Sequence, residues 1–145
     1  ESDLDSILGV AETSPFQPTD EGGRASIEGH IREGRALLAL VDVEPNELTP
    51  AGYLLWRSHL WDGRPPFIEH IDVAPDFRRQ GVGEALVQGL EQVARELGFS
   101  AIYSSTGENN ADSRAFHQKL GFEVDIVYKL KDQDEREILL SKELS

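Results

Sequence analysis

The stretch of sequence that decides the fold is Phe67–Leu97, which reads FIEHIDVAPDFRRQGVGEALVQGLEQVAREL. Its first part, Phe67–Val73, is rich in Ile and Val, which predicts a buried or half-buried strand that ends at Pro75. Apolar residues then recur at steps of three and four, which predicts an amphipathic helix closed by Gly98. The apolar face of this helix is expected to consist of Val82, Ala85, Leu86, Leu90, Val93, Ala94 and Leu97.

The hinge between this strand and this helix, residues 78–83, reads RRQGVG. Two glycines at the start of a helix let the backbone approach a ligand, and the first N–H groups of a helix have no internal partner. These groups and the positive end of the helix dipole favour anions. Arg78 and Arg79 form an adjacent basic pair in a chain of formal net charge −13, which predicts a phosphate-binding loop. A simple tight turn is the alternative.

Two common phosphate-loop patterns do not fit this hinge. No Lys followed by Ser or Thr comes after the second glycine, which excludes a nucleoside-triphosphate P-loop. The dinucleotide fingerprint fails because Leu86 occupies the position of its third glycine or alanine. A third pattern fits: the run from Val73 to Leu86 resembles the acyl-CoA-binding segment of the GNAT N-acyltransferase superfamily. That segment has the signature Arg or Gln, two residues, Gly, one residue, and Gly or Ala.

The resemblance implies that backbone amides of this loop hold the pyrophosphate of acetyl-CoA. The cofactor-binding residues that it implies here are Arg78, Arg79, Gln80, Gly81, Val82, Gly83 and Glu84.

A second segment, Asn110–Phe122, reads NADSRAFHQKLGF and resembles the family's Asn-x-x-Ala…Tyr-x-x-Leu-Gly-Phe segment. The two motifs occur in the family's order with one predicted strand between them, and together they cover about the second half of the chain. The resemblance implies that Asn110 and Ser113 contact the cofactor, Asn110 at the pantetheine arm. Capping of a helix also explains an Asn at position 110.

Composition limits the classes of protein that remain. The chain has 145 residues, 39% of them hydrophobic, which is enough for one domain with a real core. The lack of Cys excludes disulfides and thiolate sites, and we expect a cytoplasmic protein. No apolar stretch is long enough to cross a bilayer, and 27 acidic against 14 basic residues oppose binding to nucleic acids and anionic membranes.

The order of the predicted elements is that of the family's mixed α/β sheet. We expect one domain over residues 1–145, of α/β (α+β) class, with a mixed, twisted, mostly antiparallel sheet flanked by helices on both faces. The family's first strand is expected to be missing before Glu1. Helices are predicted at 2–11, 19–33 and 111–120, and strands at 35–43 (a central strand), 51–60, 99–106, 122–130 and 136–144. The second helix is expected to turn Ala25, Ile27, His30 and Ile31 inward and to end at Gly34.

Acyl transfer to an amine requires a base for the amine, a donor for the oxyanion and an acid for the leaving thiolate. The resemblance implies that pantetheine pairs with the backbone of Ile71, Asp72 and Val73 like an added strand, and that the N–H near Val73 polarises the thioester. Glu69 is the predicted general base, because strand alternation places it on the face of Ile71 and Val73. A surface or ion-paired Glu is the alternative.

His117 occupies the position where many family members have a tyrosine that acts as general acid toward the CoA sulfur. Imidazole titrates near pH 6.5 and can donate a proton, which predicts the same role for His117. A histidine on the helix surface without a function is the alternative. We expect no metal; a two-histidine, one-carboxylate iron site from His70, Asp72 and His117 is disfavoured, because such sites use all-β folds.

These observations predict an acetyl-CoA-dependent N-acetyltransferase that acts on the primary amine of a small molecule or amino-group-bearing metabolite, by direct attack in a ternary complex. The expected partners are acetyl-CoA and this amine, with neither nucleic acid nor membrane, and a homodimer is one option for the assembly. A non-catalytic acyl-CoA-binding or sensor domain of the same fold is the alternative function. The sequence does not name the amine.

Overall fold

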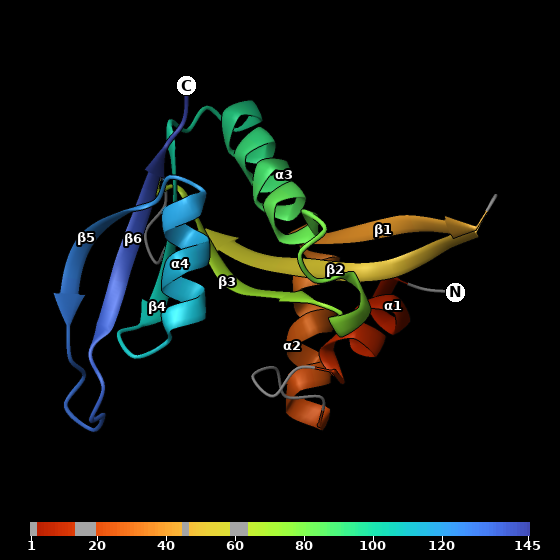
Figure 1. The fold of residues 1–145 in the computed structure, drawn as a ribbon, viewed down its shortest axis with the longest axis horizontal. Coiled ribbons are helices and arrows are strands. Elements are labelled where there is room, and N and C mark those ends of the chain that lie inside the picture. The colour runs from red at the N-terminus through yellow and green to blue at the C-terminus, as the bar shows by residue number, and fades with distance from the viewer. Residues whose placement is uncertain (1–2, 14–19, 45–46, 59–63) are drawn as a thin grey trace. The chain divides into compact units, whose positions relative to one another are not determined.

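The computed structural model in Figure 1 describes residues 3–13, 20–44, 47–58 and 64–145. Its six strands have the order β1-β2-β3-β4-β6-β5. β3 pairs with β4 in parallel, and the pairs β1–β2, β4–β6 and β5–β6 are antiparallel, so the predicted mixed and mostly antiparallel sheet is confirmed. The elements are α1 (Asp3–Ala11), α2 (Glu21–Arg32), β1 (Ala36–Glu44), β2 (Glu47–Ser58), β3 (Pro66–Val73), η1 (Pro75–Phe77), α3 (Val82–Glu96), β4 (Ala101–Gly107), α4 (Ala111–Lys119), β5 (Glu123–Tyr128) and β6 (Glu137–Glu143).

The first of two compact units comprises Glu1–Arg57 and Glu69–Leu90. Its helices α1 and α2 turn their apolar faces toward β2, because the apolar residues of α1 recur at helical spacing. Asp20 caps α2 by accepting a hydrogen bond from the N–H of Gly23 at 2.9 Å. The core cluster of this unit consists of Ile7, Leu8, Val10, Ala11, Ile27, Tyr53 and Leu55.

The second compact unit comprises Ser58–Ile68 and Glu91–Ser145. Its strand β4 alternates strictly, with Ile102, Ser104 and Thr106 buried and their neighbours half-buried. Opposite these residues, β6 turns Ile138 and Leu140 into the same core. The helix predicted at 111–120 is α4, and Gly121 follows it with a φ of 91°, a left-handed conformation that commonly ends a helix.

Most predicted elements are confirmed within a few residues of their expected ends, and two details differ. The segment predicted as a central strand is β1, which lies at one end of the strand order, and its side chains are mostly half-buried or exposed, as expected for a strand paired on one side. Ala25, Ala85 and Leu97 are exposed, because they lie at the margins of their helix faces. The predicted start of the first helix at Ser2 and the predicted end of a strand at Leu60 lie outside the described residues. None of the described helices has the length and apolar character needed to cross a membrane.

At Gly52 the backbone of β2 lies very close to β3 and α3. A Cβ atom added there would lie 2.8 Å from the carbonyl oxygen of Asp72 and 3.0 Å from Cγ1 of Val82. Such distances leave no room for a methyl group, so the sequence needs glycine at this position for the strand that leads into the hinge to lie where it does.

We therefore expect Gly52→Ala to lower the free energy of unfolding by about 1–3 kcal/mol, because an extra methyl group in a packed site forces the backbone to shift. Urea denaturation followed by circular dichroism measures the change. Gly9→Ala is the matched control: a Cβ there meets nothing within 4 Å. In the interior of α1 it is expected to stabilise by about 0.5–1 kcal/mol. Equal stability of Gly52→Ala and the wild type would contradict the close approach.

Candidate functional site

A short 3-10 turn, η1, connects β3 to the predicted phosphate loop. In it the N–H of Phe77 donates to the carbonyl oxygen of Ala74 at 2.9 Å. The backbone then adopts the left-handed conformation twice, at Arg79 (φ 62°) and at Gly81 (φ 80°). Arg79 is the one non-glycine residue with a positive φ in the described part of the chain. A non-glycine residue in this region is uncommon and is concentrated at functional sites.

The loop delivers the chain to the N-terminus of α3 with several N–H groups free. The first internal hydrogen bond of this 15-residue helix runs from the N–H of Ala85 to the carbonyl oxygen of Gly81, at 2.9 Å. The N–H groups of Val82, Gly83 and Glu84 come before it, and no described residue accepts a hydrogen bond from them. N–H groups of this kind, together with the helix dipole and a neighbouring left-handed residue, are able to donate hydrogen bonds to an anion.

The side chains of the loop leave this helix end open. Val82 is buried and anchors the first turn of α3, whereas Arg78, Arg79 and Gln80 are exposed. Nε of Arg78 donates to the carbonyl oxygen of Val73 at 3.3 Å, and Nε2 of Gln80 donates to that of Asp76 at 3.2 Å. Residues 78–84 thus form one continuous segment in which two exposed arginines precede the free N–H groups, and its role as a phosphate-binding loop stays a prediction.

The strand that precedes the loop has an open backbone edge. Register pairing of β3 with β4 is confined to Phe67 and Tyr103 among the described residues. On the other edge, the N–H of Ala74 donates to the carbonyl oxygen of Ala51 at 2.8 Å. Successive N–H groups of a strand point to opposite edges, so the N–H of Val73 points to the edge that lacks a strand partner.

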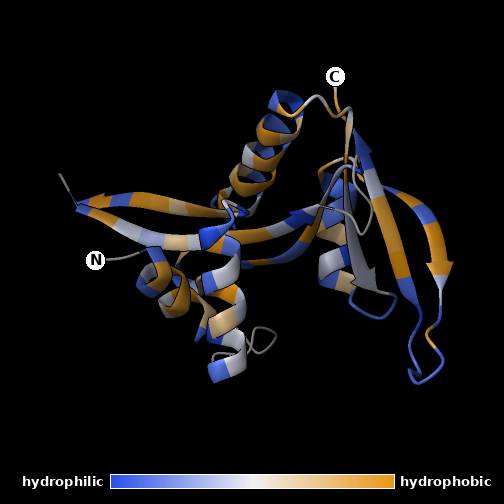
Figure 2. Cartoon of the chain, turned by 180° about the vertical axis from the view of Figure 1, so that it is seen from behind, coloured by the Kyte–Doolittle hydropathy of each residue, from blue (hydrophilic) through white to orange (hydrophobic). Residues whose placement is uncertain are grey.

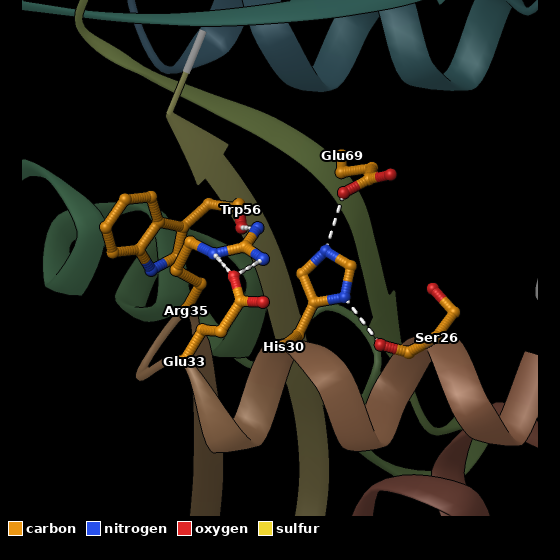
Figure 3. Close-up of polar contacts among 6 residues, drawn as sticks. All are labelled: Ser26, His30, Glu33, Arg35, Trp56 and Glu69. Carbon is orange, nitrogen blue, oxygen red and sulfur yellow. Dashed lines mark hydrogen bonds and ion pairs between the residues drawn. The ribbon is translucent and has the colours of Figure 1, made fainter. Parts of the chain in front are cut away.

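Figure 3 shows Glu69 of β3 beside His30 of α2. Nε2 of His30 lies 2.6 Å from Oε2 of Glu69, and Nδ1 lies 2.7 Å from the carbonyl oxygen of Ser26. A carbonyl oxygen only accepts, so Nδ1 has a proton, and a second proton must lie between Nε2 and the carboxylate. The Glu69 side chain is 40% exposed against 9% for His30. The carboxylate is thus held by one oxygen, and Oε1 has no partner within the described residues.

His30 is the only cationic partner of Glu69 in this group of side chains. The nearby Arg35 is occupied elsewhere: it donates from Nε to Glu33 at 3.0 Å and from a terminal nitrogen to the carbonyl oxygen of Trp56 at 3.1 Å. Arg35 in turn holds the pKa of Glu33 below its usual value. The sequence predicted that His30 faces inward, which is confirmed, but no local pattern links it to a glutamate 39 residues away.

His70 and Asp72 belong to a separate network in the same unit. The hydroxyl of Tyr53 donates to Oδ2 of Asp72 at 2.5 Å, and Nε2 of His70 lies 2.8 Å from the same oxygen. Burial raises the pKa of Tyr53, and the Asp72 carboxylate raises it further, so the phenol stays a donor. Among the described residues no group of three or more His, Cys, Asp and Glu side chains is placed to hold a metal ion, so His70, Asp72 and His117 form no iron site there.

His117 lies in the second unit, buried on α4 with 4% of its surface exposed. Nδ1 lies 2.7 Å from the carbonyl oxygen of Ser113, and Nε2 lies 2.7 Å from Oγ of Ser104. Burial lowers the pKa of His117, so the ring is neutral, with its proton on Nδ1 and Nε2 accepting from the Ser104 hydroxyl. Its role as general acid stays a prediction. The proton on Nδ1 is donated to the carbonyl oxygen of Ser113, and Nε2 contacts the hydroxyl of Ser104.

Asn110 has the structural role that the sequence offered as an alternative. Its Oδ1 accepts a hydrogen bond from the N–H of Ser113 at 3.1 Å and caps α4. A contact of Asn110 and Ser113 with pantetheine stays a prediction. The first unit thus brings together Glu69 and the residues of the hinge, and the second unit brings together Asn110, Ser113 and His117.

Solved structures show which class of fold this is. A protein of the GNAT family from Desulfovibrio desulfuricans, assigned as an acetyltransferase, superposes with a TM-score of 0.81 at 20% identity, covering 99% of this chain and 93% of that one. A Bacillus anthracis protein assigned as a streptothricin acetyltransferase, solved with acetyl-coenzyme A, gives a TM-score of 0.62 at 23% identity over 71% and 65% of the two chains. These similarities establish the GNAT fold.

The sequence comparison then establishes the family. The profile of the acetyltransferase (GNAT) family matches residues 4–122, so the chain belongs to this family. An L-methionine sulfoximine/L-methionine sulfone acetyltransferase of Pseudomonas paraeruginosa is 32% identical over 109 residues, 74% of this chain. The chain spans 62% of the length of that relative, a little under two thirds.

The buried, neutral His117 predicts a pH dependence of stability. Below about pH 6.5 the unfolded chain protonates this histidine and the folded chain does not, so the free energy of unfolding falls as the pH is lowered, by up to about 1.4 kcal/mol per pH unit, until the folded pKa is reached. Above pH 6.5 the group contributes no slope. Urea denaturation of the wild type and His117→Asn between pH 5 and 8 tests this. The stability difference between them should shrink as the pH falls, and a constant difference would contradict a buried neutral ring.

Proposed function

We propose that residues 1–145 act as one domain that transfers the acetyl group of acetyl-CoA to the primary amine of a small molecule or amino-group-bearing metabolite. The observation that carries the proposal is the open N-terminus of α3, where the N–H groups of Val82, Gly83 and Glu84 lie beside Arg78 and Arg79. Membership of the GNAT family supports the activity, and the similar Pseudomonas enzyme, named for two methionine derivatives, supports a small amine as acceptor.

The pyrophosphate of acetyl-CoA is proposed to bind at the start of α3. Its negative charges would accept hydrogen bonds from the free N–H groups and lie next to both guanidinium groups. In a chain of net charge −13, this basic and donor-rich spot is where an anion is least repelled.

The pantetheine arm is proposed to run along the open edge of β3. Backbone groups of Ile71, Asp72 and Val73 would pair with its amides, which is the addition of a strand by a ligand. The N–H of Val73 points to this edge and would donate to the thioester oxygen, stabilising the oxyanion of the tetrahedral intermediate.

Glu69 is proposed as the general base. The amine nitrogen attacks the thioester carbon and forms the C–N bond, and Oε1 of Glu69 takes the amine proton directly or through a water molecule, while the C–S bond breaks and the thiolate leaves. His30 acts here as a positioning residue. Its hydrogen bond to Oε2 holds the carboxylate in one orientation and leaves Oε1 without a partner among the described residues.

Binding and turnover are tested separately. We expect calorimetry to show CoA binding, and thiol release to show turnover on at least one member of an amine panel. Arg79→Ala should weaken CoA binding by about tenfold or more, because it removes a charge-assisted contact. Arg24→Ala, an exposed arginine on α2, is the matched control and should not change it. CoA binding without turnover on any amine would favour the sensor domain, and no CoA binding would overturn both functions.

The roles of Glu69 and His30 predict a graded series of kcat values. Glu69→Gln should lower kcat by about 100-fold. His30→Leu should lower it by about tenfold, since the carboxylate loses its fixed orientation, and His30→Gln, which keeps a donor near the position of Nε2, should recover most of that loss. The affinity for CoA should stay unchanged in all three variants. Ile27→Val, a destabilising change on the same helix by about 1 kcal/mol, controls for stability. A kcat of His30→Leu equal to that of the wild type would remove His30 from the mechanism and leave the base untouched.

A further inference from the structure

A carboxylate on β3 collects hydrogen bonds next to the open edge of this strand. Oδ2 of Asp72 accepts a hydrogen bond from the hydroxyl of Tyr53 at 2.5 Å, and Nε2 of His70 lies 2.8 Å from the same oxygen. The rings of Tyr53 and His70 stack, with their centroids 6.0 Å apart and an angle of 24° between their planes. Tyr53 is fully buried, and the side chains of Asp72 and His70 are 10% and 19% exposed. These three side chains are the Asp72 network.

The chemistry of the groups fixes the direction of each hydrogen bond. Burial raises the pKa of Tyr53, and the Asp72 carboxylate raises it further, so the phenol keeps its proton and donates. A carboxylate in its ionised form accepts hydrogen bonds and donates none, so His70 has a proton on Nε2 whether its ring is neutral or charged. Nδ1 of His70 has no hydrogen bond to a described residue. His70 therefore acts in this network as a donor.

The backbone of the same segment is held to β2 on one side. The N–H of Ala74 donates to the carbonyl oxygen of Ala51 at 2.8 Å, and a Cβ atom added at Gly52 would lie 2.8 Å from the carbonyl oxygen of Asp72. Successive residues of a strand face opposite edges, so Asp72 faces β2 and the residues before and after it face the open edge. Tyr53 follows Gly52 along β2. The Asp72 network thus fastens β3 to β2 directly behind the open edge.

Stability alone does not account for a carboxylate at this position. Aspartate is depleted in strands, and burial of a carboxylate has a desolvation cost that its hydrogen bonds only partly offset. Ile71 and Val73 surround Asp72 in the sequence, and the charged and polar residues of β3 form hydrophilic bands between hydrophobic ones in Figure 2. A local choice that works against folding is expected where a function needs a group in a fixed place.

We propose that Tyr53, Asp72 and His70 are positioning residues, which fix the open edge of β3 for the pantetheine arm and the thioester of acetyl-CoA. This inference rests on the proposed binding of pantetheine at that edge. The three side chains act through the backbone of β3 and do not contact the ligand. A ligand that pairs with a strand needs the backbone groups on either side of Asp72 in line at the same time.

The physical effect of the Asp72 network is preorganisation. An edge that is held from behind loses less conformational freedom when a ligand pairs with it, which strengthens binding without a new contact. It also keeps the N–H of Val73 aimed at the thioester oxygen while charge develops there in the transition state. Loss of the network should therefore weaken the binding of the pantetheine arm and slow the chemical step, and it should leave the distant pyrophosphate site unchanged.

Two ligands of different length provide the test. Acetyl-CoA occupies the whole proposed site, whereas the nucleotide half of CoA, which ends at the pyrophosphate, lacks the pantetheine arm. Tyr53→Phe keeps the ring and removes the hydroxyl that donates to Asp72. In calorimetry this variant should bind acetyl-CoA about tenfold more weakly and the nucleotide half with unchanged affinity, because only the edge has lost its support.

A pair of substitutions at His70 tests the other donor. His70→Leu should also weaken acetyl-CoA binding by about tenfold, and His70→Gln, which can place an N–H close to Oδ2 of Asp72, should restore most of the affinity. With an amine that the wild type acetylates, Tyr53→Phe and His70→Leu should lower kcat by about tenfold and leave the KM for the amine unchanged. The His70 pair gives the same test should Tyr53→Phe fail to fold.

Tyr128→Phe is the matched control, since it removes a hydroxyl from an exposed tyrosine on β5 and should change neither affinity. Wild-type affinity for acetyl-CoA in both Tyr53→Phe and His70→Leu overturns the inference and leaves the proposed function standing. An equal loss of affinity for the two ligands also overturns it, because these residues then support the fold as a whole. A wild type that binds neither ligand overturns the proposed function itself and this inference with it.

Discussion

The path of the backbone from β3 into α3 is the constraint on which the rest of the candidate site depends. After β3 and the short turn η1, left-handed conformations at Arg79 and Gly81 turn the chain into α3. The helix therefore begins with three N–H groups that no described residue accepts from. Buried Val82 and the close approach at Gly52 hold this path in place from the core side, so the open helix end is a product of packing as well as of local sequence.

Two histidines show how a tertiary partner decides the hydrogen bonds of a residue. His30 and His117 both lie on helices, are both buried, and both place Nδ1 at 2.7 Å from the carbonyl oxygen four residues earlier. Their local settings are thus the same. At Nε2 they differ: His30 lies against the carboxylate of Glu69, whereas His117 accepts a hydrogen bond from the hydroxyl of Ser104.

This difference bears on the chemistry that each histidine supports. A histidine paired with a half-exposed carboxylate can hold in place a group that still reaches solvent, which suits a positioning role for His30. The ring of His117 contacts Ser113 and Ser104 and holds no group that reaches solvent. The position of His117 in the family motif predicted a general acid. In the structure its side chain is buried and both ring nitrogens have hydrogen-bond partners. A sequence motif does not show whether a residue is buried, so this could not be predicted.

Local sequence patterns determined the parts of this protein that depend on neighbours along the chain. Helical spacing predicted α3, and the RRQGVG motif predicted a hinge in which the first N–H groups of that helix are free. Periodicity, left-handed backbone and free helix N–H groups are local properties, so neighbours along the chain are enough to determine them. The tertiary structure alone decided that β1 lies at the end of the strand order and that His30 meets Glu69. These features join residues far apart in sequence, and which groups meet there depends on how the whole chain packs.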